Sequence, residues 1–215
     1  MRPEQLAESY PRLFHMAWQG SWENIRKYGL LSTQALVELY KLSPEQGGLL
    51  LQNHRPEWVE ISCAGLGTAT VRDQKPMSDK GVCTALGVND PRPWYELLNS
   101  MVFFWPTKER LRTMMSAKAY IGMKHDLLVV DTKKLVDRHC DNIRLSRMNS
   151  GATKPFSHPR DLNLFKTFEE FPFGDRRKRC GVKKAVAEVC VLNSVRDIKD
   201  LVVDVRTVTL DDIEF

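Results

Sequence analysis

Three side chains of this sequence have types and settings that could do chemistry. Glu188 is the only charged residue in the apolar run AVAEVCVL. His15 stands in the middle of the apolar segment LFHMA, and Arg72 follows the segment ATV. A carboxylate can stabilise developing positive charge, an imidazole can accept or donate a hydrogen bond, and a guanidinium can hold an anion at two points. Together they indicate a site for a charged or phosphorylated substrate.

Each of these side chains also has a purely structural explanation. Alternation along its strand puts Glu188 on a face with apolar neighbours, which favours a pocket because an unpaired buried carboxylate is costly. A surface glutamate on an edge strand would give the same pattern. A histidine among apolar residues is often a hydrogen-bonded core residue. Arg72 is followed by Asp73, so a local ion pair is the alternative there.

A run of cations is the fourth feature. Between Gly174 and Lys184 the only acid is Asp175, and the bases are Arg176, Arg177, Lys178, Arg179, Lys183 and Lys184. Such a cluster creates a local positive field that suits phosphate or another polyanion. A solvated, flexible loop is the other explanation for an isolated basic run.

The composition is typical of an ordinary globular protein. The chain has 215 residues, of which 42% are hydrophobic and 27% charged, and its formal net charge is +5. This length predicts one domain over residues 1–215. Five scattered cysteines without a C-x-x-C pair favour reduced thiols and argue against a zinc site. The absence of a secretory signal and of an apolar run of ~20 residues predicts a cytoplasmic protein without a membrane partner.

The elements that must position these residues follow from apolar periodicity and capping signals. Strands are predicted at 13–17, 101–106, 125–132, 143–153, 185–193 and 203–210. Helices are predicted at 22–29, 30–42, 55–62, 91–101, 107–120 and 194–202. Ser32 or Thr33 is the expected N-cap of the second helix, Thr107 that of the fifth, and the strand at 125–132 should be buried on both faces. Residues 43–56 are predicted to be a connection and 152–183 a long loop.

This order of elements predicts an α+β fold. Regular alternation of strands and helices is missing, and so is a G-x-G-x-x-G loop. A doubly wound dinucleotide-binding domain is therefore not expected. A mixed sheet arrangement flanked by helices fits the order of elements better.

Three blocks in this order resemble the ADP-ribosyltransferase superfamily, in particular its DarT-like toxin branch. They are LFHMAWQGSWENIRKYGLLS, MVFFWPTKERLRTMMSAKAYIG and KKAVAEVCVLNSVRDI. The chain is also similar to an uncharacterised bacterial family with VRDQKPM, VFFW and MNSG blocks. The first resemblance implies split mixed β-sheets flanked by helices, with NAD⁺ as co-substrate. It also implies a transferase of the toxin or phage-defence kind, with a possible antitoxin partner.

The resemblance implies a role for each candidate residue. Glu188 would be the catalytic carboxylate, beside the ribosyl centre that becomes oxocarbenium-like when nicotinamide leaves. His15 would bind a ribose and Arg72 the pyrophosphate. Backbone groups near Asn149–Gly151 would close the pocket. The remaining cofactor-binding candidates are Gln74, Phe104, Trp105 and Tyr120, with an aromatic from 103–105 or Tyr120 flanking the nicotinamide ring.

The cations would bind the acceptor. By resemblance Arg176, Arg177, Lys178 and Arg179 lie in the acceptor-recognition loop, and Phe171 and Phe173 could stack on bases, which favours nucleic acid, DNA or RNA. A base in a single strand or flipped from a duplex would be required.

Two departures from the family's patterns narrow the function. Val186 stands where the protein-modifying class with paired glutamates has an acid, and Glu188 argues against the tRNA phosphotransferases of the same fold. A protein-directed transferase and a non-catalytic nucleic-acid-binding module remain the alternatives.

Overall fold

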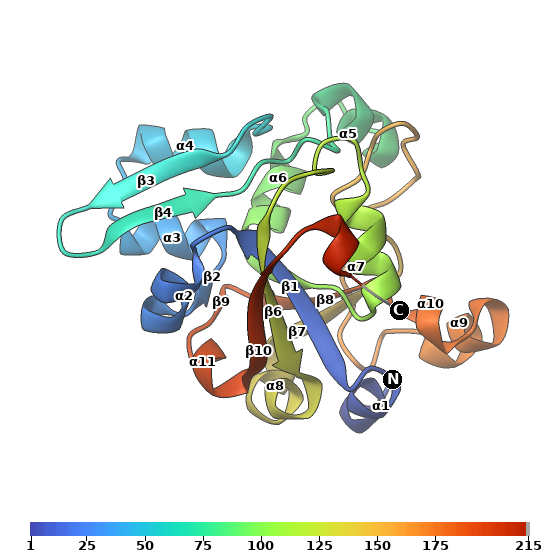
Figure 1. Cartoon of the computed structure of the whole chain (residues 1–215). Coiled ribbons are helices and arrows are strands. Elements are labelled where there is room, and N and C mark those ends of the chain that lie inside the picture. Colours follow the sequence, from blue (N-terminus) through green and yellow to red (C-terminus); the bar gives the residue numbers. More distant parts are fainter. Residues whose placement is uncertain (214–215) are drawn as a thin grey trace.

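The computed structural model describes residues 1–213 as four small antiparallel sheets with helices around them (Figure 1). This confirms the predicted α+β class. Two of the sheets have three strands and form the centre of the molecule, while the other two are two-stranded. Within residues 1–213 no helix is long and apolar enough to cross a membrane.

The first central sheet has the order β1-β6-β10. Its middle strand β6 (His125–Asp131) pairs antiparallel with β1 (Arg12–Trp18) and with β10 (Val202–Val208). Six consecutive residues of β6 are buried, which confirms that both faces of this strand are covered. The continuous apolar run in the sequence is explained by this central position.

The second central sheet has the order β5-β8-β7. Here β8 (Glu188–Leu192) lies between β5 (Met101–Phe104) and β7 (Ile143–Ser146). Glu188 is therefore on a central strand, and only 3% of it is exposed. The explanation of Glu188 as a surface residue on an edge strand is wrong.

Backbone hydrogen bonds join the two central sheets at one position. Phe14 of β1 and Trp105, just beyond β5, exchange both backbone hydrogen bonds, at 2.9 and 2.8 Å. Figure 1 shows β1 running across the molecule in front of the fainter β7 and β8 strands. A large apolar cluster, with Leu128 and Val189 among its fully buried members, packs between the layers.

Several helices form as predicted because their caps are strong. Ser32 accepts a hydrogen bond from Ala35 N at the start of α3, and Thr107 does the same for Arg110 N at α7. The predicted helices correspond to α2 (Trp22–Tyr28), α3 (Thr33–Leu39), α6 (Arg92–Asn99), α7 (Lys108–Met115) and α11 (Ile198–Leu201). Elements without a prediction are α1 (Pro3–Ser9), α5 (Asp79–Leu86) and α8 (Thr132–His139). The first two residues of the helices predicted at 30–42 and 194–202 are not helical: they form β2 (Leu30–Leu31) and β9 (Ser194–Val195), which pair with each other.

Two segments differ from the prediction. Residues 43–56 are not a connection but contain α4 (Pro44–Gln52), whose N-cap Ser43 forms a reciprocal capping box with Gln46. Residues 55–62 are not helical. Their second half is β3 (Val59–Cys63), which forms a hairpin with β4 (Gly67–Val71) and projects from one side of the molecule (Figure 1).

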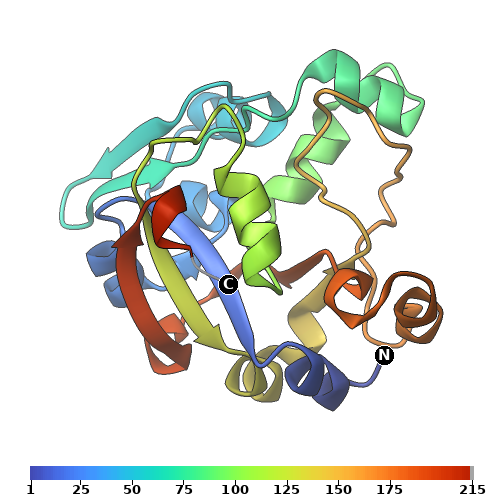
Figure 2. The same ribbon diagram turned by 45° about the vertical axis from the view of Figure 1, so that its right-hand side comes forward.

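The predicted long loop at 152–183 is not irregular over its whole length, because its C-terminal part is helical. Its last residues form α9 (Phe173–Cys180), followed by the short α10 (Val182–Ala185). These two helices make a lobe on the opposite side of the molecule from the β3–β4 hairpin, as Figure 1 and Figure 2 both show. The basic run is therefore held by helical structure directly before β8.

Leu128→Ala is expected to destabilise the protein by about 3 kcal/mol, because Leu128 is fully buried at the centre of β6 and the truncation leaves a cavity. The free energy of unfolding from urea titration measures this effect. Leu162→Ala is the matched control, since Leu162 is 48% exposed, and its effect should stay within about 0.5 kcal/mol. Equal losses in the two variants would contradict the described core.

Candidate functional site

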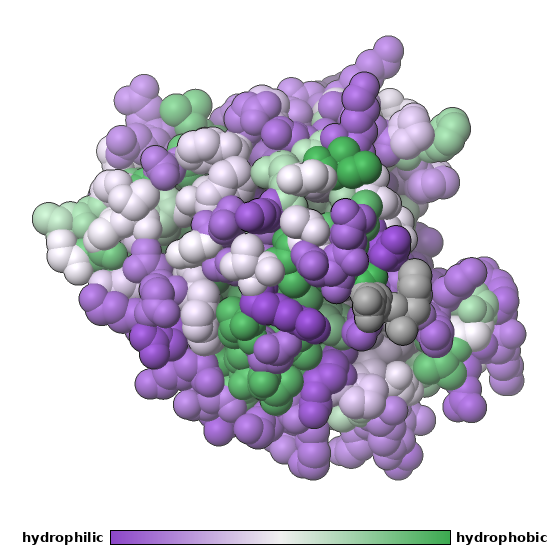
Figure 3. Space-filling view, in the orientation of Figure 1, coloured by the Kyte–Doolittle hydropathy of each residue, from purple (hydrophilic) through white to green (hydrophobic). Residues whose placement is uncertain are grey.

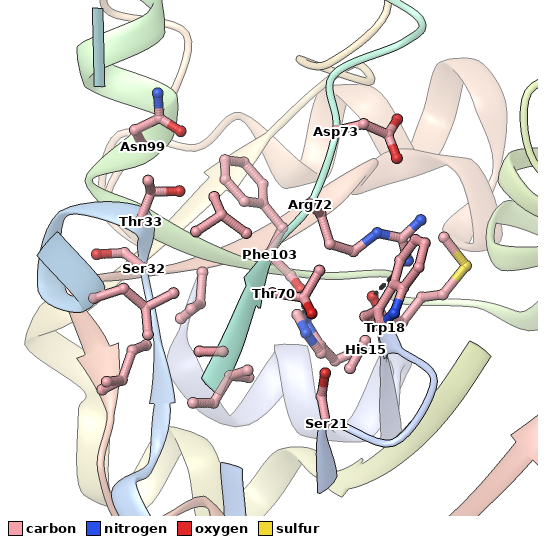
Figure 4. Close-up of a pocket in the computed structure, with 18 of the residues that line it drawn as sticks. His15, Trp18, Ser21, Ser32, Thr33, Thr70, Arg72, Asp73, Asn99 and Phe103 are labelled. Atoms are coloured by element: carbon pink, nitrogen blue, oxygen red, sulfur yellow. Dashed lines mark hydrogen bonds between the residues drawn. The ribbon is translucent and has the colours of Figure 1, made fainter. Parts of the chain in front are cut away.

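A cavity of about 520 Å³ lies beside the contact between the two central sheets. Its walls come from β1, α2, β2, α3, β4 and β5, together with Glu188 at the start of β8. Figure 4 shows His15, Trp18 and Arg72 gathered on one side of the cavity, with Ser32, Thr33 and Asn99 on the other. Its volume is within the range of small-molecule sites.

Six of the seven residues predicted for catalysis and cofactor binding line this cavity. They are Glu188, His15, Arg72, Gln74, Trp105 and Tyr120. Phe104 does not line it. Phe104 is 1% exposed and belongs to the apolar cluster between the sheets, because successive residues of β5 point to opposite faces. Its neighbour Phe103 lines the cavity instead. The Phe104 ring packs edge-on against the His15 ring, with 5.8 Å between the two ring centroids.

His15 is neutral and has a fixed tautomer. Its Nδ1 lies 2.9 Å from the backbone carbonyl of Phe103, which can only accept, so Nδ1 carries the hydrogen. Burial lowers the pKa of His15 to about 4. The other ring nitrogen, Nε2, is thus a hydrogen-bond acceptor on a side chain that lines the cavity.

Arg72 is held by one of its terminal nitrogens. Nη1 donates to the carbonyl of Met16 and to Nδ1 of His125, both at 3.3 Å. Nη2 is buried and has no hydrogen-bond partner within residues 1–213. Burial lowers the pKa of Arg72, so the fold holds this cation at a cost. A buried donor without a partner points to a ligand oxygen that the protein does not supply.

A local ion pair with Asp73, the alternative explanation of Arg72, is not formed in the described structure. Asp73 Oδ1 accepts hydrogen bonds from the Tyr120 hydroxyl at 2.7 Å and from Lys75 N at 3.1 Å. The Tyr120 ring lies 5.4 Å from the Arg72 guanidinium. Asp73 therefore orients Tyr120, and Tyr120 covers Arg72.

Glu188 is a buried carboxyl group with one clear hydrogen-bond donor. Ser150 N lies 3.1 and 3.2 Å from its two carboxyl oxygens. Burial raises the pKa of Glu188 to about 7, against the lowering effect of Ser150 and of the nearby Arg110 and Arg160 charges. A carboxyl group that titrates near neutrality inside a cavity is a candidate for catalysis.

The loop that holds Glu188 depends on a residue that sequence reasoning missed. Arg160 is 5% exposed and donates to the carbonyls of Ser150 and Ala152, each at 2.7 Å. This fixes the turn at 149–151, whose three residues line the cavity as the resemblance implied. No local pattern marks Arg160, because its partners are backbone carbonyls of an irregular loop.

Gln74 has a structural contact besides its place in the cavity wall. Its Oε1 accepts from Arg55 N at 3.1 Å. Arg55 is 7% exposed and donates to Asn99 Oδ1 at 3.0 Å and to Arg72 O at 3.1 Å. Gln74 thus joins the cavity wall to α6.

The four predicted acceptor-binding cations lie on α9 and do not line the cavity. Arg176 is half-buried and donates to the carbonyls of Ala185 and Arg147. Arg177 lines a separate hollow of about 320 Å³ near the N-terminus. Phe171 and Phe173 are 3% and 5% exposed in the core, so the expectation that they stack on bases is wrong.

No group of three or more His, Cys, Asp or Glu side chains in the described range 1–213 is placed to hold a metal ion. A family model described as "Family of unknown function (DUF7002)" matches residues 11–202, which include every residue of the cavity. No curated protein and no solved structure matches the chain.

Proposed function

This chain belongs to DUF7002, a family of unknown function, and we propose that it is a mono-ADP-ribosyltransferase that uses NAD⁺ to modify nucleic acid. The observation that carries the proposal is that His15, Arg72 and Glu188, far apart in sequence, line one cavity. As part of it we assign the central sheets to an ADP-ribosyltransferase-like split arrangement. Their contact at Phe14 and Trp105 supports that assignment.

The polar groups of the cavity fit the dinucleotide. Arg72 Nη2 would donate to a pyrophosphate oxygen, which supplies the partner that this buried nitrogen lacks. His15 Nε2 would accept from a ribose hydroxyl, because the hydrogen on Nδ1 is committed to Phe103 O. Trp105 and Tyr120 offer aromatic surface for a planar ring.

Glu188 would act on the ribosyl carbon. When the bond between this carbon and nicotinamide breaks, the electron pair leaves with nicotinamide and positive charge develops on the ribose. An ionised carboxylate nearby stabilises that charge. The acceptor then bonds to the same carbon, and Glu188 takes the proton that the acceptor loses. A pKa near 7 suits a group that must be ionised first and protonated afterwards.

A nucleic-acid acceptor is supported by the basic helices next to β8. Arg179 and Lys184 are exposed there, and Arg110 is close enough to Glu188 to affect its pKa. A polyanion would be drawn to this side of the cavity.

The direct test incubates the purified protein with NAD⁺ and measures nicotinamide by chromatography. Single-stranded DNA, RNA and cell proteins are offered separately, and mass spectrometry looks for an added ADP-ribose. Nicotinamide release with modified nucleic acid supports the proposal. Modified protein alone would favour the protein-directed alternative, and no nicotinamide release would leave a binding module.

The rate of nicotinamide release is expected to rise with pH and to level off above about pH 8. Only the ionised form of Glu188 is active, and its pKa of about 7 sets the midpoint of kcat/KM in the free enzyme. His15 adds no step near its ordinary pKa, since burial has lowered that pKa to about 4. A profile of kcat/KM against pH checks this. A flat profile between pH 6 and 8 would contradict the role of Glu188.

A further inference from the structure

Arginines gather just outside the cavity, next to Glu188. The guanidinium groups of Arg110 and Arg176 both donate to the carbonyl of Lys184, at 3.3 and 3.4 Å, so they lie side by side. Arg176 also donates to the carbonyl of Arg147 at 2.9 Å. After burial, the positive charges of Arg179, Arg147 and Arg110 further lower the pKa of Arg176. These four arginines, Arg110, Arg147, Arg176 and Arg179, are called the arginine cluster below.

The positive charge of the cluster is not neutralised by carboxylates at its centre. The hydrogen bonds of Arg110 and Arg176 go to backbone carbonyls. Arg110 Nε is buried without a partner in the described part of the chain. Burial lowers the pKa of Arg110, and the charge of the Glu188 carboxylate partly opposes this effect. The repulsion between these like charges and the unpaired Arg110 Nε both disfavour the folded state, and such an arrangement is typical of a site that receives an anion.

The lobe of α9 and α10, which carries Arg176 and Arg179, faces solvent. Arg147 and Arg179 are exposed, and the projecting lobe is mainly hydrophilic in Figure 3, with a few hydrophobic side chains between the polar ones. Because α10 leads directly into β8, the cluster is joined to the strand that begins with Glu188. An anion bound here would lie next to the end of the cavity where transfer would occur.

An exposed aromatic ring lies on a second segment near the cavity. Phe156 is 73% exposed and is followed two residues later by His158. Its loop is anchored by backbone hydrogen bonds from Lys154 N to Pro76 O and from Arg160 N to Ala85 O. Pro76 lines the cavity. An exposed ring at such a rim can stack on a nucleobase.

We infer that the arginine cluster binds backbone phosphates of a single-stranded nucleic acid and that Phe156 stacks on one of its bases. A guanidinium contacts a phosphate at two points, and a cavity site can act only on a base that is not stacked in a duplex. The inference rests on the proposed function for the reaction at Glu188. Binding of the strand can be measured without that reaction.

Fluorescence anisotropy of a labelled single-stranded DNA oligonucleotide and its RNA counterpart, without NAD⁺, tests this inference. The combined variant Arg147→Ala/Arg179→Ala should bind at least one of them about tenfold more weakly than the unmodified protein does. The slope of log affinity against log salt should fall by about two. Phe156→Ala should weaken binding by about fivefold or more and leave the salt slope unchanged.

Arg177→Ala is the control for the Arg179 substitution, because Arg177 also lies on α9 but lines the hollow near the N-terminus. Its affinity should change less than about twofold. Equal losses in the control and the cluster variant would overturn the inference, as would tighter binding of a poly-glutamate peptide than of either oligonucleotide. Strand binding without nicotinamide release would remove the proposed function alone, whereas nicotinamide release without strand binding would remove this inference alone.

Discussion

Glu188→Gln is expected to lower the rate of nicotinamide release by about a thousandfold and to leave NAD⁺ affinity within about twofold. The substitution removes the negative charge that stabilises the ribosyl carbon, and losses of this size follow removal of one electrostatic contact in a transition state. The glutamine carbonyl can still accept from Ser150 N, so the loop at 149–151 should stay in place. Single-turnover rates and calorimetric NAD⁺ binding measure the two effects.

The free energy of unfolding of Glu188→Gln serves as the control that the variant is folded and has lost the buried carboxyl group. The pKa of Glu188 is raised from 4.5 to about 7 in the folded protein, so the stability of the unmodified protein falls as pH rises between these values. Glu188→Gln has no such fall and should be more stable at pH 8 by roughly 3 kcal/mol. Glu45→Gln, on the exposed start of α4, should change neither rate nor stability. Full turnover by Glu188→Gln would remove Glu188 from the mechanism.

Much of the fold could be predicted because its signals are local. The caps Ser32 and Thr107 bond to backbone groups three residues away, and these bonds form with little help from the rest of the chain. The apolar run of β6 predicts a strand covered on both faces, which is what the middle position in a sheet gives.

The wrong segments show where tertiary contacts outweigh local preference. Two glycines in 43–56 suggested a connection, yet Ser43, Pro44 and Gln46 cap a helix there. Gly47 is needed for close packing, because a Cβ at this position would lie 2.9 Å from Cγ1 of Val37. Val59–Cys63 alternates apolar and polar residues, which is a strand signal that the helical prediction for 55–62 passed over. Pairing with β4 determines its structure.

The candidate site was predictable in its residue types and not in its fine geometry. One residue of register separates Phe103, which lines the cavity, from Phe104, which does not, and sequence alone does not fix which face of β5 is turned inward. Arg110 binds a backbone carbonyl 74 residues away, and Arg160 binds backbone carbonyls of its own irregular loop. Such contacts leave no pattern in a single sequence, so these two arginines could be found only from the structure.

Replacing Arg72 is expected to weaken NAD⁺ binding by about a hundredfold. Arg72→Met fills a similar volume but cannot donate to the pyrophosphate, and a charge-assisted hydrogen bond is worth about 1.5–3 kcal/mol. Arg72→Lys keeps the positive charge but places it on a single nitrogen. In the arginine, Nη1 binds Met16 O while Nη2 stays available for the ligand, and one lysine nitrogen cannot reach both positions. A loss of NAD⁺ affinity of about tenfold is therefore expected. Calorimetric titration measures both affinities.

Comparing three ligands distinguishes a direct contact of Arg72 with the pyrophosphate from a purely structural role of Arg72. Arg72 also donates to Met16 O and to His125, so its loss leaves two acceptors in the wall unpaired and lowers stability as well. If Arg72 Nη2 meets the pyrophosphate, then NAD⁺ and ADP-ribose should weaken equally in Arg72→Met. Nicotinamide riboside has no pyrophosphate and should keep its affinity. Equal weakening of all three ligands would instead mean that Arg72 holds β1 in the shape of the cavity and does not touch the phosphates.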